Sequence, residues 1–229
     1  MSDPASAHEA WERAWTSLSG NPDKPSRWRV AEQSVARLVS SLARSGASYV
    51  LDIGSGLGRH TTLMAQSGLH VTAIDASPRA VAETRRNLRE LNLPGEVLRA
   101  SFLSLPFSAD TFDFVLAWNV LYHGDDHSVR RACDEVGRVL RPGGLFQGTM
   151  LSARHRRNGK GTEVSPHAFV VPDATDDKAY PHYYCDARDL LSLHPWLEPI
   201  ELADVDQAAD DLNRQGSYHW EFVFEKAKG

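Results

Sequence analysis

The chain has 229 residues, of which 41% are hydrophobic, and its formal net charge is −5. A chain of this length buries a core without disulfides or structural metal. The acidic balance argues against a nucleic-acid or anionic-membrane surface, because binding to phosphates needs dense lysine and arginine.

The beginning of the chain carries charged residues and no apolar run. Residues 1–15 include Asp3, Glu9 and Glu12, without the hydrophobic stretch of a secretory signal. No later stretch has the length and apolarity of a bilayer-spanning helix. The sequence therefore predicts a cytoplasmic monomer or homodimer that acts on a small molecule and binds neither nucleic acid nor membrane.

Helix and strand patterns alternate through the first two thirds of the chain. Helices are indicated by apolar residues at helical spacing, and buried strands by short runs that are apolar on both faces. The expected elements are a helix over 28–44, a strand over 49–53, a helix over 59–66, a strand over 69–74, a helix from Ser77 to Leu91, strands over 96–100 and 112–118, a helix over 129–140 and a strand over 145–150. Such alternation produces a parallel sheet with helices on both faces.

The pattern changes after Met150. Residues 152–184 are polar and lack periodicity, which predicts a long irregular segment, usually functional or mobile in a compact domain. A helix over 187–193 follows. Strands over 200–205 and 218–225, joined by a polar loop, then predict an antiparallel hairpin.

The strongest chemical signal is the run Asp52-Ile53-Gly54-Ser55-Gly56-Leu57-Gly58, which lies between a strand and a helix. Glycines let the backbone turn tightly and approach a ligand without a Cβ in the way. Asp75 ends the next strand, where a carboxylate accepts hydrogen bonds from ribose hydroxyls. The pattern predicts a cofactor that contains a ribose.

Two cofactor classes compete for this loop. A dinucleotide uses the spacing Gly-x-Gly-x-x-Gly and a helix N-terminus aimed at its pyrophosphate, whereas the spacing here is Gly-x-Gly-x-Gly. Asp52 would repel a pyrophosphate but attract the positive amino and sulfonium groups of S-adenosylmethionine. The sequence favours S-adenosylmethionine, with an NAD(P)-dependent oxidoreductase and a non-catalytic cofactor-binding module as alternatives.

With these residues the sequence resembles the class I S-adenosylmethionine-dependent methyltransferases. The matching motifs are Asp52 to Gly58, Asp75, Leu105-Pro106-Phe107, Phe112 to Val115 and Arg141 to Gly144. The resemblance covers residues 46–150 and implies a Rossmann-like, doubly wound, three-layer α/β/α fold whose seven-stranded sheet is mostly parallel with an antiparallel last strand. Shorter stretches, Trp118 to His123, Pro181 to Tyr184 and Gly216 to Trp220, resemble tellurite-resistance-type and related small-molecule methyltransferases.

The resemblance also implies a division of the chain and a set of cofactor contacts. Residues 1–229 form one domain, with N-terminal helices or a lid over 1–45, a cofactor-binding half over 46–150 and a substrate-side segment over 151–229. Asp52 and the loop glycines would cradle the methionine part, and Asp75 would hold the ribose. Ser101 and Phe102 stand where the family often has an adenine-binding aspartate. The expected cofactor-binding residues are Asp52, Gly54, Ser55, Gly56, Gly58, Asp75, Ala76, Ser101, Phe102, Trp118 and Asn119.

Two histidines are candidates for catalysis. His123 follows the fourth strand at the carboxyl edge of the sheet, where ligands bind in open α/β folds, and histidine accepts a proton near neutral pH. His182 lies in the irregular segment. The alternative is that His123 packs under the cofactor and that His182 belongs to a rim loop. No cysteine or histidine pair has metal-ligand spacing, so no metal is expected.

Five further residues are candidates for substrate contact. They are Trp15, Trp28, Tyr122, Arg154 and Tyr183. The tryptophans would form an aromatic lid, or pin the first helices to the core. Arg154 would clamp an anionic substrate, or belong to a solvated loop. The sequence does not choose between an oxygen, nitrogen, sulfur or metalloid oxyanion acceptor.

Overall fold

The computed structural model describes residues 11–12, 15, 27–172, 174, 177–208 and 215–228. Most of the expected N-terminal lid and part of the hairpin loop therefore lie outside the described residues. The elements are η1 (Arg27–Arg29), α2 (Gln33–Ser45), β1 (Tyr49–Ile53), α3 (Arg59–Gln66), β2 (His70–Asp75), α4 (Pro78–Glu90), β3 (Glu96–Arg99), β4 (Phe112–Ala117), α5 (Asp126–Val139), β5 (Leu140–Ser152), β6 (Thr162–Ser165), β7 (Ala168–Val170), η2 (Asp177–Ala179), β8 (His182–Cys185), α6 (Ala187–Ser192), β9 (Leu197–Asp206) and β10 (Tyr218–Lys226).

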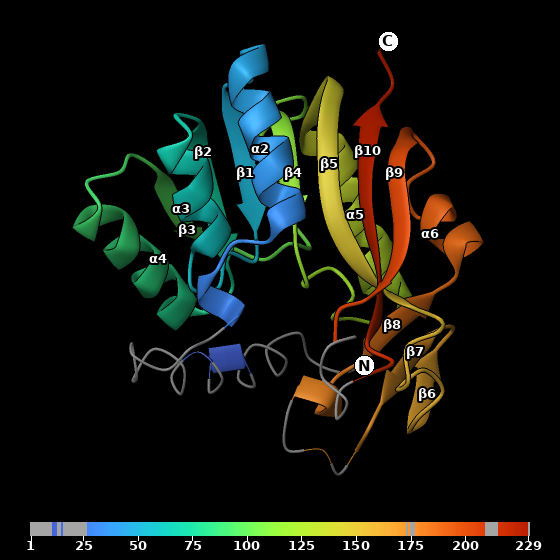
Figure 1. The fold of residues 1–229 in the computed structure, drawn as a ribbon. Helices are drawn as coiled ribbons and strands as arrows, with labels where there is room; N and C mark the ends of the chain where they lie inside the picture. Colours follow the sequence, from blue (N-terminus) through green and yellow to red (C-terminus); the bar gives the residue numbers. More distant parts are fainter. Residues whose placement is uncertain are drawn as a thin grey trace.

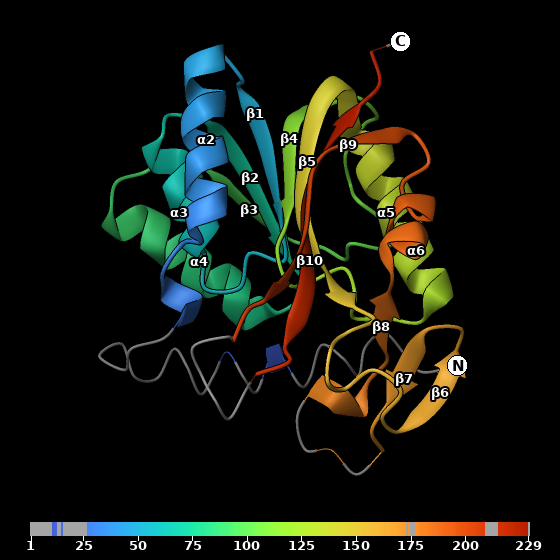
Figure 2. The ribbon, with the colours of Figure 1, turned by 45° about the vertical axis from the view of Figure 1, so that its right-hand side comes forward.

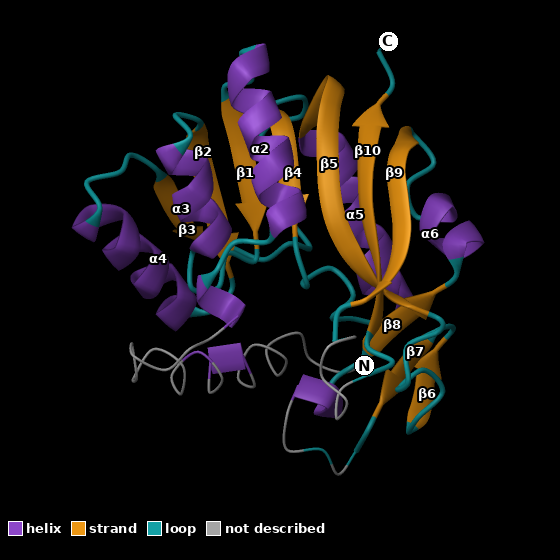
Figure 3. Ribbon diagram, in the orientation of Figure 1, coloured by secondary structure: helices purple, strands orange, loops and turns teal. Residues whose placement is uncertain are grey.

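The main sheet has the order β3-β2-β1-β4-β5-β10-β9 (Figure 1). The first five strands are parallel to one another, and β10 runs antiparallel to both β5 and β9. Figure 3 shows these strands as one twisted layer between helices. The expected seven-stranded Rossmann-like sheet with an antiparallel last strand is confirmed, as is the hairpin of β9 and β10.

Two hydrophobic cores lie on the two faces of this sheet. Helices α2, α3 and α4 cover one face, and α5 and α6 cover the other (Figure 2). Alternate residues of one strand point to opposite faces, so Val50 and Phe114 pack under α2 to α4, whereas Leu51 and Val115 pack under α5. Burial on both faces explains why these strands are continuous apolar runs in the sequence.

The expectation of an irregular segment over 152–184 was wrong in part. β6, β7 and β8 form a small antiparallel extension, and β8 also pairs in parallel with the end of the long strand β5. All four residues of β8, His182–Cys185, are buried, so the strand has no polar–apolar alternation to detect. The extension lies at the end of the sheet to which β1 points, next to the carboxyl ends of the parallel strands (Figure 1).

Element boundaries shifted by a few residues where local chemistry was ambiguous. The first helix begins at Gln33, after the short turn η1, and β5 already starts at Leu140. The start of α4 agrees with its expected cap, because the Ser77 side chain accepts a hydrogen bond from the backbone N–H of Ala80. Among the described residues, no helix combines the length and apolarity needed to cross a membrane.

Candidate cofactor and acceptor site

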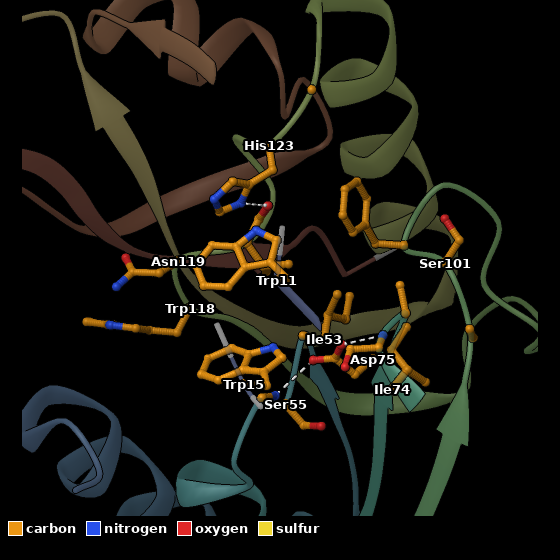
Figure 4. Close-up of a pocket in the computed structure, with 18 of the residues that line it drawn as sticks. Trp11, Trp15, Ile53, Ser55, Ile74, Asp75, Ser101, Trp118, Asn119 and His123 are labelled. Carbon is orange, nitrogen blue, oxygen red and sulfur yellow. Dashed lines mark hydrogen bonds between the residues drawn. The ribbon is translucent and has the colours of Figure 1, made fainter. Parts of the chain in front are cut away.

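A pocket opens at the carboxyl ends of β1, β2 and β4 (Figure 4). Its walls are the loops that follow β1 to β4, three tryptophans near the start of the chain, and Tyr180 with Pro181. This is the edge of an open α/β sheet at which ligands bind. In Figure 4, Asp75 and His123 lie at opposite ends of the pocket.

The glycine loop after β1 is fixed by its backbone. The N–H groups of Gly54 and Ser55 both donate to the carbonyl of Ile74, at 2.8 and 3.1 Å. Gly54 has a φ of +72°, and a Cβ there would lie 2.6 Å from Cγ2 of Val120. A side chain at this position is therefore excluded both by conformation and by space.

Asp75 is oriented by two backbone groups at the end of β2. Its Oδ2 accepts from Gly56 N–H, and its Oδ1 accepts from Ser77 N–H, both at 2.9 Å. These two bonds hold both oxygens of the carboxylate in a defined orientation. Asp75 is half-buried and lines the pocket, as a ribose-binding carboxylate must.

Asp52 lies under the glycine loop and is not among the residues that line the pocket. Its Oδ2 accepts a hydrogen bond of 2.6 Å from Thr61 Oγ1. Burial raises the pKa of Asp52 to about 6, against the lowering effects of Thr61 and Arg59. The structure thus places the Asp52 carboxylate beneath the pocket and not in its wall.

The residues expected at the adenine end lie together. Ala76, Ser101 and Phe102 all line the pocket. Ser101 Oγ already accepts from Leu103 N–H at 3.2 Å, which fixes the turn that follows β3. Gly58 does not line the pocket; a Cβ there would lie 2.9 Å from the Thr84 side chain, so Gly58 permits the packing of α3 on α4.

Trp118 and Asn119 directly follow β4 and line the pocket wall. Asn119 has a left-handed φ of +57°, a conformation in which asparagine is enriched among residues other than glycine. The hydroxyl of Thr149 accepts from Asn119 N–H at 2.8 Å and donates to Asn119 Oδ1 at 2.9 Å. The buried Nε1 of Trp118 has no hydrogen-bond partner among the described residues, so a donor is left for a ligand.

Three tryptophans near the beginning of the chain line the pocket. Trp11 stacks on Trp15 with ring centroids 5.3 Å apart, and Trp28 meets both edge-on at 6.3 and 5.8 Å. Trp15 is buried against Leu57 and Ala80. Trp15 and Trp28 both line the pocket and pack on the core, so the structure pins them to the core while it leaves the lid role a prediction.

His123 lines the opposite end of the pocket, and His182 is buried directly behind it, outside the pocket lining. Their ring centroids are 4.8 Å apart, and Trp11 meets His123 edge-on at 5.1 Å. The Nδ1 of His123 lies 2.8 Å from the carbonyl of Val120, and the Nδ1 of His182 lies 2.9 Å from that of Tyr180. A carbonyl only accepts, so each Nδ1 carries a proton and the Nε2 of each ring is on the side away from that carbonyl.

Asp177 and Lys178 meet these two Nε2 atoms. Asp177 Oδ2 lies 3.1 Å from His182 Nε2 and 3.6 Å from His123 Nε2, and Lys178 Nζ lies 2.8 Å from both Asp177 Oδ2 and His182 Nε2. Burial raises the pKa of Asp177, but the two histidines and Lys178 outweigh it and hold that pKa well below the usual range. Burial lowers the pKa of His182 to about 4, although Asp177 raises it.

Three of the expected substrate residues lie outside the pocket lining. Tyr122 and Tyr183 are buried behind it, where Tyr183 N–H donates to the carbonyl of Tyr122 at 2.9 Å. The exposed guanidinium of Arg154 lies 4.0 Å from the Tyr218 ring centroid and pairs with Asp204 at 3.3 Å. An anion-clamp role for Arg154 would need this arrangement to change.

Sequence reasoning missed Asp177, Lys178 and Thr149. Asp177 lies five residues before His182, and that spacing of carboxylate and histidine was the available signal. The segment was treated as a loop without a partner, so nothing linked it to His123. Thr149 looked like an ordinary strand residue, because only the register between β4 and β5 brings it to Asn119.

Comparison with known proteins assigns the family. A methyltransferase domain family matches residues 50–144. An S-adenosyl-L-methionine-dependent Diels-Alderase from Neonectria sp. is 28% identical over 203 residues, 87% of this chain and 76% of that protein. The chain belongs to the class I S-adenosylmethionine-dependent methyltransferases. The likeness to the tellurite-resistance branch is only loose, and the NAD(P) alternative is not favoured.

Further matches agree on the family and differ in the reaction. A ubiquinone biosynthesis O-methyltransferase from Methylocella silvestris is 36% identical over 164 residues, 70% of this methyltransferase but 57% of that protein. The 1,6-didemethyltoxoflavin-N1-methyltransferase of Burkholderia thailandensis, solved with S-adenosylhomocysteine, shares the fold with a TM-score of 0.67 at 18% identity, over 100% of this chain and 92% of that one. The [4+2]-cyclase SpnF has a TM-score of 0.65 at 19% identity, over 96% and 94%.

The residues present fit S-adenosylmethionine, the cofactor of this family. The loop at Gly54 admits no Cβ, which keeps the backbone close to a bound ligand. Asp75 offers a fixed carboxylate for ribose hydroxyls, and Trp118 offers an unused N–H. Ile74 and Phe102 provide apolar walls for a base.

Proposed function

We propose that this methyltransferase transfers a methyl group from S-adenosylmethionine to a small-molecule acceptor, with His123 as the general base where the acceptor must lose a proton. The observation that carries this proposal is the layout of the pocket. Asp75 and the glycine loop form one end of it, and His123 forms the other. One pocket is thus lined both by residues that suit the cofactor and by a side chain that accepts a proton.

The cofactor supplies a methyl group already activated by the sulfonium charge. Asp75 and the glycine loop orient it, and most of the acceleration comes from alignment and exclusion of water. Trp11 and Trp15 provide the water-excluding cover. His123 takes the acceptor proton on Nε2, because Nδ1 is held by Val120. The carboxylate of Asp177 stabilises the imidazolium that forms.

The surroundings of His123 favour an apolar acceptor with a hydroxyl or amine group. Trp11, Val120 and Pro181 give this end of the pocket apolar walls, and a proton acceptor is needed only for a group that is protonated near neutral pH. The O-methyltransferase of Methylocella silvestris and the N1-methyltransferase of Burkholderia thailandensis agree with such acceptors. A thiolate or a metalloid oxyanion needs alignment alone.

A second candidate is a cofactor-dependent cyclisation without methyl transfer. It is favoured by the Neonectria Diels-Alderase, which matches 87% of this chain, and by the fold shared with SpnF. In that case the cofactor completes the pocket and the tryptophans shape an apolar substrate. His123 then contacts the substrate without receiving a proton.

The deciding experiment incubates the chain with methyl-labelled S-adenosylmethionine and a panel of phenols, amines, thiols and metalloid oxyanions. The readouts are label in the acceptor and formation of S-adenosylhomocysteine. We expect transfer to a phenol or an amine, abolished in a chain carrying both Asp75→Ala and His123→Ala. Tight cofactor binding with no label transferred to any acceptor, together with cyclisation of a diene substrate, would replace the methyl-transfer proposal by the second one.

A further inference from the structure

Three ligand atoms converge at the acceptor end of the pocket. His123 Nε2, His182 Nε2 and a carboxylate oxygen of Asp177 all lie within 4.8 Å of one another. Metal–ligand bonds of about 2.1 Å place neighbouring ligand atoms roughly 3 to 3.5 Å apart. The distances of 3.1 and 3.6 Å from Asp177 to the two histidines are close to that spacing.

Both imidazoles are oriented as metal ligands are. Each holds its Nδ1 against a backbone carbonyl, Val120 for His123 and Tyr180 for His182. In metal sites the hydrogen bond of the distant ring nitrogen fixes the tautomer and aims the other nitrogen at the ion. Here the Nε2 atoms of both rings lie beside the same carboxylate oxygen of Asp177. Two imidazole nitrogens and a carboxylate oxygen that converge in this way can bind one cation together.

Lys178 supplies a cation in this structure. Its Nζ contacts Asp177 and His182 at 2.8 Å each, and the site is mostly buried, with His182 1% exposed. A lysine ammonium brings one charge on a flexible chain, whereas a divalent ion brings two and binds all three ligand atoms at once. Lys178 and a metal ion would therefore compete for the same space.

We propose that His123, Asp177 and His182 bind one divalent first-row transition metal ion. Two imidazoles and one carboxylate suit zinc, cobalt, iron or nickel better than magnesium or calcium, which prefer all-oxygen ligands. Three protein ligands leave at least one coordination position open. Because His123 lines the pocket, that position is next to the acceptor.

The consequence for the substrate rests on the proposed function. A metal ion at this place binds an acceptor hydroxyl and lowers its pKa, which selects a phenol or another hydroxyl compound over an amine. His123 Nε2 cannot ligate the ion and accept a proton at once. In the metal-loaded chain the ion therefore replaces the base: the bound hydroxyl loses its proton to solvent water, and the resulting oxyanion takes the methyl group. A chelator separates the two modes.

The test titrates the chelator-treated full chain with cobalt(II) chloride, followed by visible absorption and calorimetry. We expect one ion per chain and d–d bands of a nitrogen- and oxygen-bound ion. Asp177→Asn keeps the shape of the side chain and should weaken binding by about 100-fold or more, as should His182→Ala. Lys178→Met should tighten binding, because the competing ammonium is gone. His127→Ala, an exposed histidine near the same pocket wall, should change nothing.

Affinity for S-adenosylhomocysteine is measured on the same samples and reports an intact fold. A wild-type chain that binds S-adenosylhomocysteine but shows no saturable cobalt binding overturns the metal site and leaves the proposed function standing. Cobalt binding that is the same in Asp177→Asn and His182→Ala also overturns it. Saturable binding lost in those variants, in a chain that transfers no methyl group, supports the metal site and contradicts the proposed function.

Discussion

The two ends of the pocket are built in different ways. The cofactor end consists of loops that follow adjacent strands and is fixed mainly by backbone hydrogen bonds, such as those of Gly54 to Ile74 and of Gly56 to Asp75. The histidine end joins His123 to Asp177 and His182, from segments far apart in the chain, through side chains. Backbone geometry leaves a local sequence signature, whereas side-chain convergence does not.

The difference also concerns charge. At the cofactor end one buried carboxylate, Asp52, has its pKa raised to about 6. At the histidine end the carboxylate of Asp177 is buried but stays ionised, because cationic and hydrogen-bonding partners surround it. The ionised form of Asp52 would be stabilised by the positive charge of a ligand, whereas Asp177 already has positive charge beside it.

The largest effect is expected from His123→Ala. If the histidine end carries the chemistry, turnover should fall by roughly 10²- to 10⁴-fold, the usual contribution of a general base. Affinity for S-adenosylhomocysteine should hardly change, because that ligand belongs to the other end. Turnover of His127→Ala provides the matched control. Near-normal turnover of His123→Ala would show that the acceptor arrives deprotonated or that His182 is the base.

Asp52→Asn should change stability in a pH-dependent way. The folded-state pKa of about 6 exceeds the ordinary aspartate value of 3.8, so the native state of the wild type holds an extra proton between these pH values. The contribution of Asp52 to the stability of the wild type is therefore greatest at low pH and decreases as the pH rises to about 6. The asparagine variant does not titrate and therefore does not lose stability in this way. Above pH 6 its free energy of unfolding should exceed that of the wild type by up to about 3 kcal/mol.

Urea unfolding without cofactor at a series of pH values measures this difference. The free energies of unfolding of the two proteins should become equal near pH 4. A stability difference that is constant from pH 4 to pH 7.5 would show that Asp52 does not titrate in the fold. A cationic ligand favours ionised Asp52, so affinity of the wild type for S-adenosylmethionine should fall below about pH 6, and that of Asp52→Asn should be less dependent on pH.

Asp75→Ala should weaken cofactor binding with little effect on the histidine end. Loss of hydrogen bonds to a charged group costs about 1.5 to 3 kcal/mol, or roughly 10- to 150-fold in affinity, measured by calorimetry with S-adenosylhomocysteine. Cobalt affinity should be unchanged. Asp134→Ala, which removes an exposed carboxylate of α5, is the control. Equal affinity in Asp75→Ala and wild type would remove Asp75 from the cofactor site.

Trp11→Ala should produce the smallest effect and should act on both ends. Trp11 stacks on Trp15 and meets His123 edge-on, and such ring pairs contribute about 0.5 to 1.5 kcal/mol each. Cofactor affinity and turnover should therefore each fall by roughly 2- to 13-fold. A change confined to one of the two quantities would show that Trp11 belongs to that end alone.

Much of the fold could be predicted, because its signals are local. Buried parallel strands appear as apolar runs, helices as periodic patterns, and the start of α4 as Ser77 followed by Pro78. The small extension was missed because all of β8 is buried and its partners, β5 and β7, lie elsewhere in the chain. A strand that pairs with partners elsewhere in the chain, and is buried on both faces, leaves no periodic pattern in its own sequence.

The sequence by itself determined the sheet, the glycine loop and the carboxylate of Asp75, because each depends on backbone conformations that particular residues favour or permit. Only the tertiary structure decided that Asp52 lies beneath the pocket, that Arg154 is bound to Asp204, and that Asp177 meets both histidines. These contacts join residues by side chains across large sequence separations. Their energy depends on burial and on neighbouring charge, which exist only once the chain has folded.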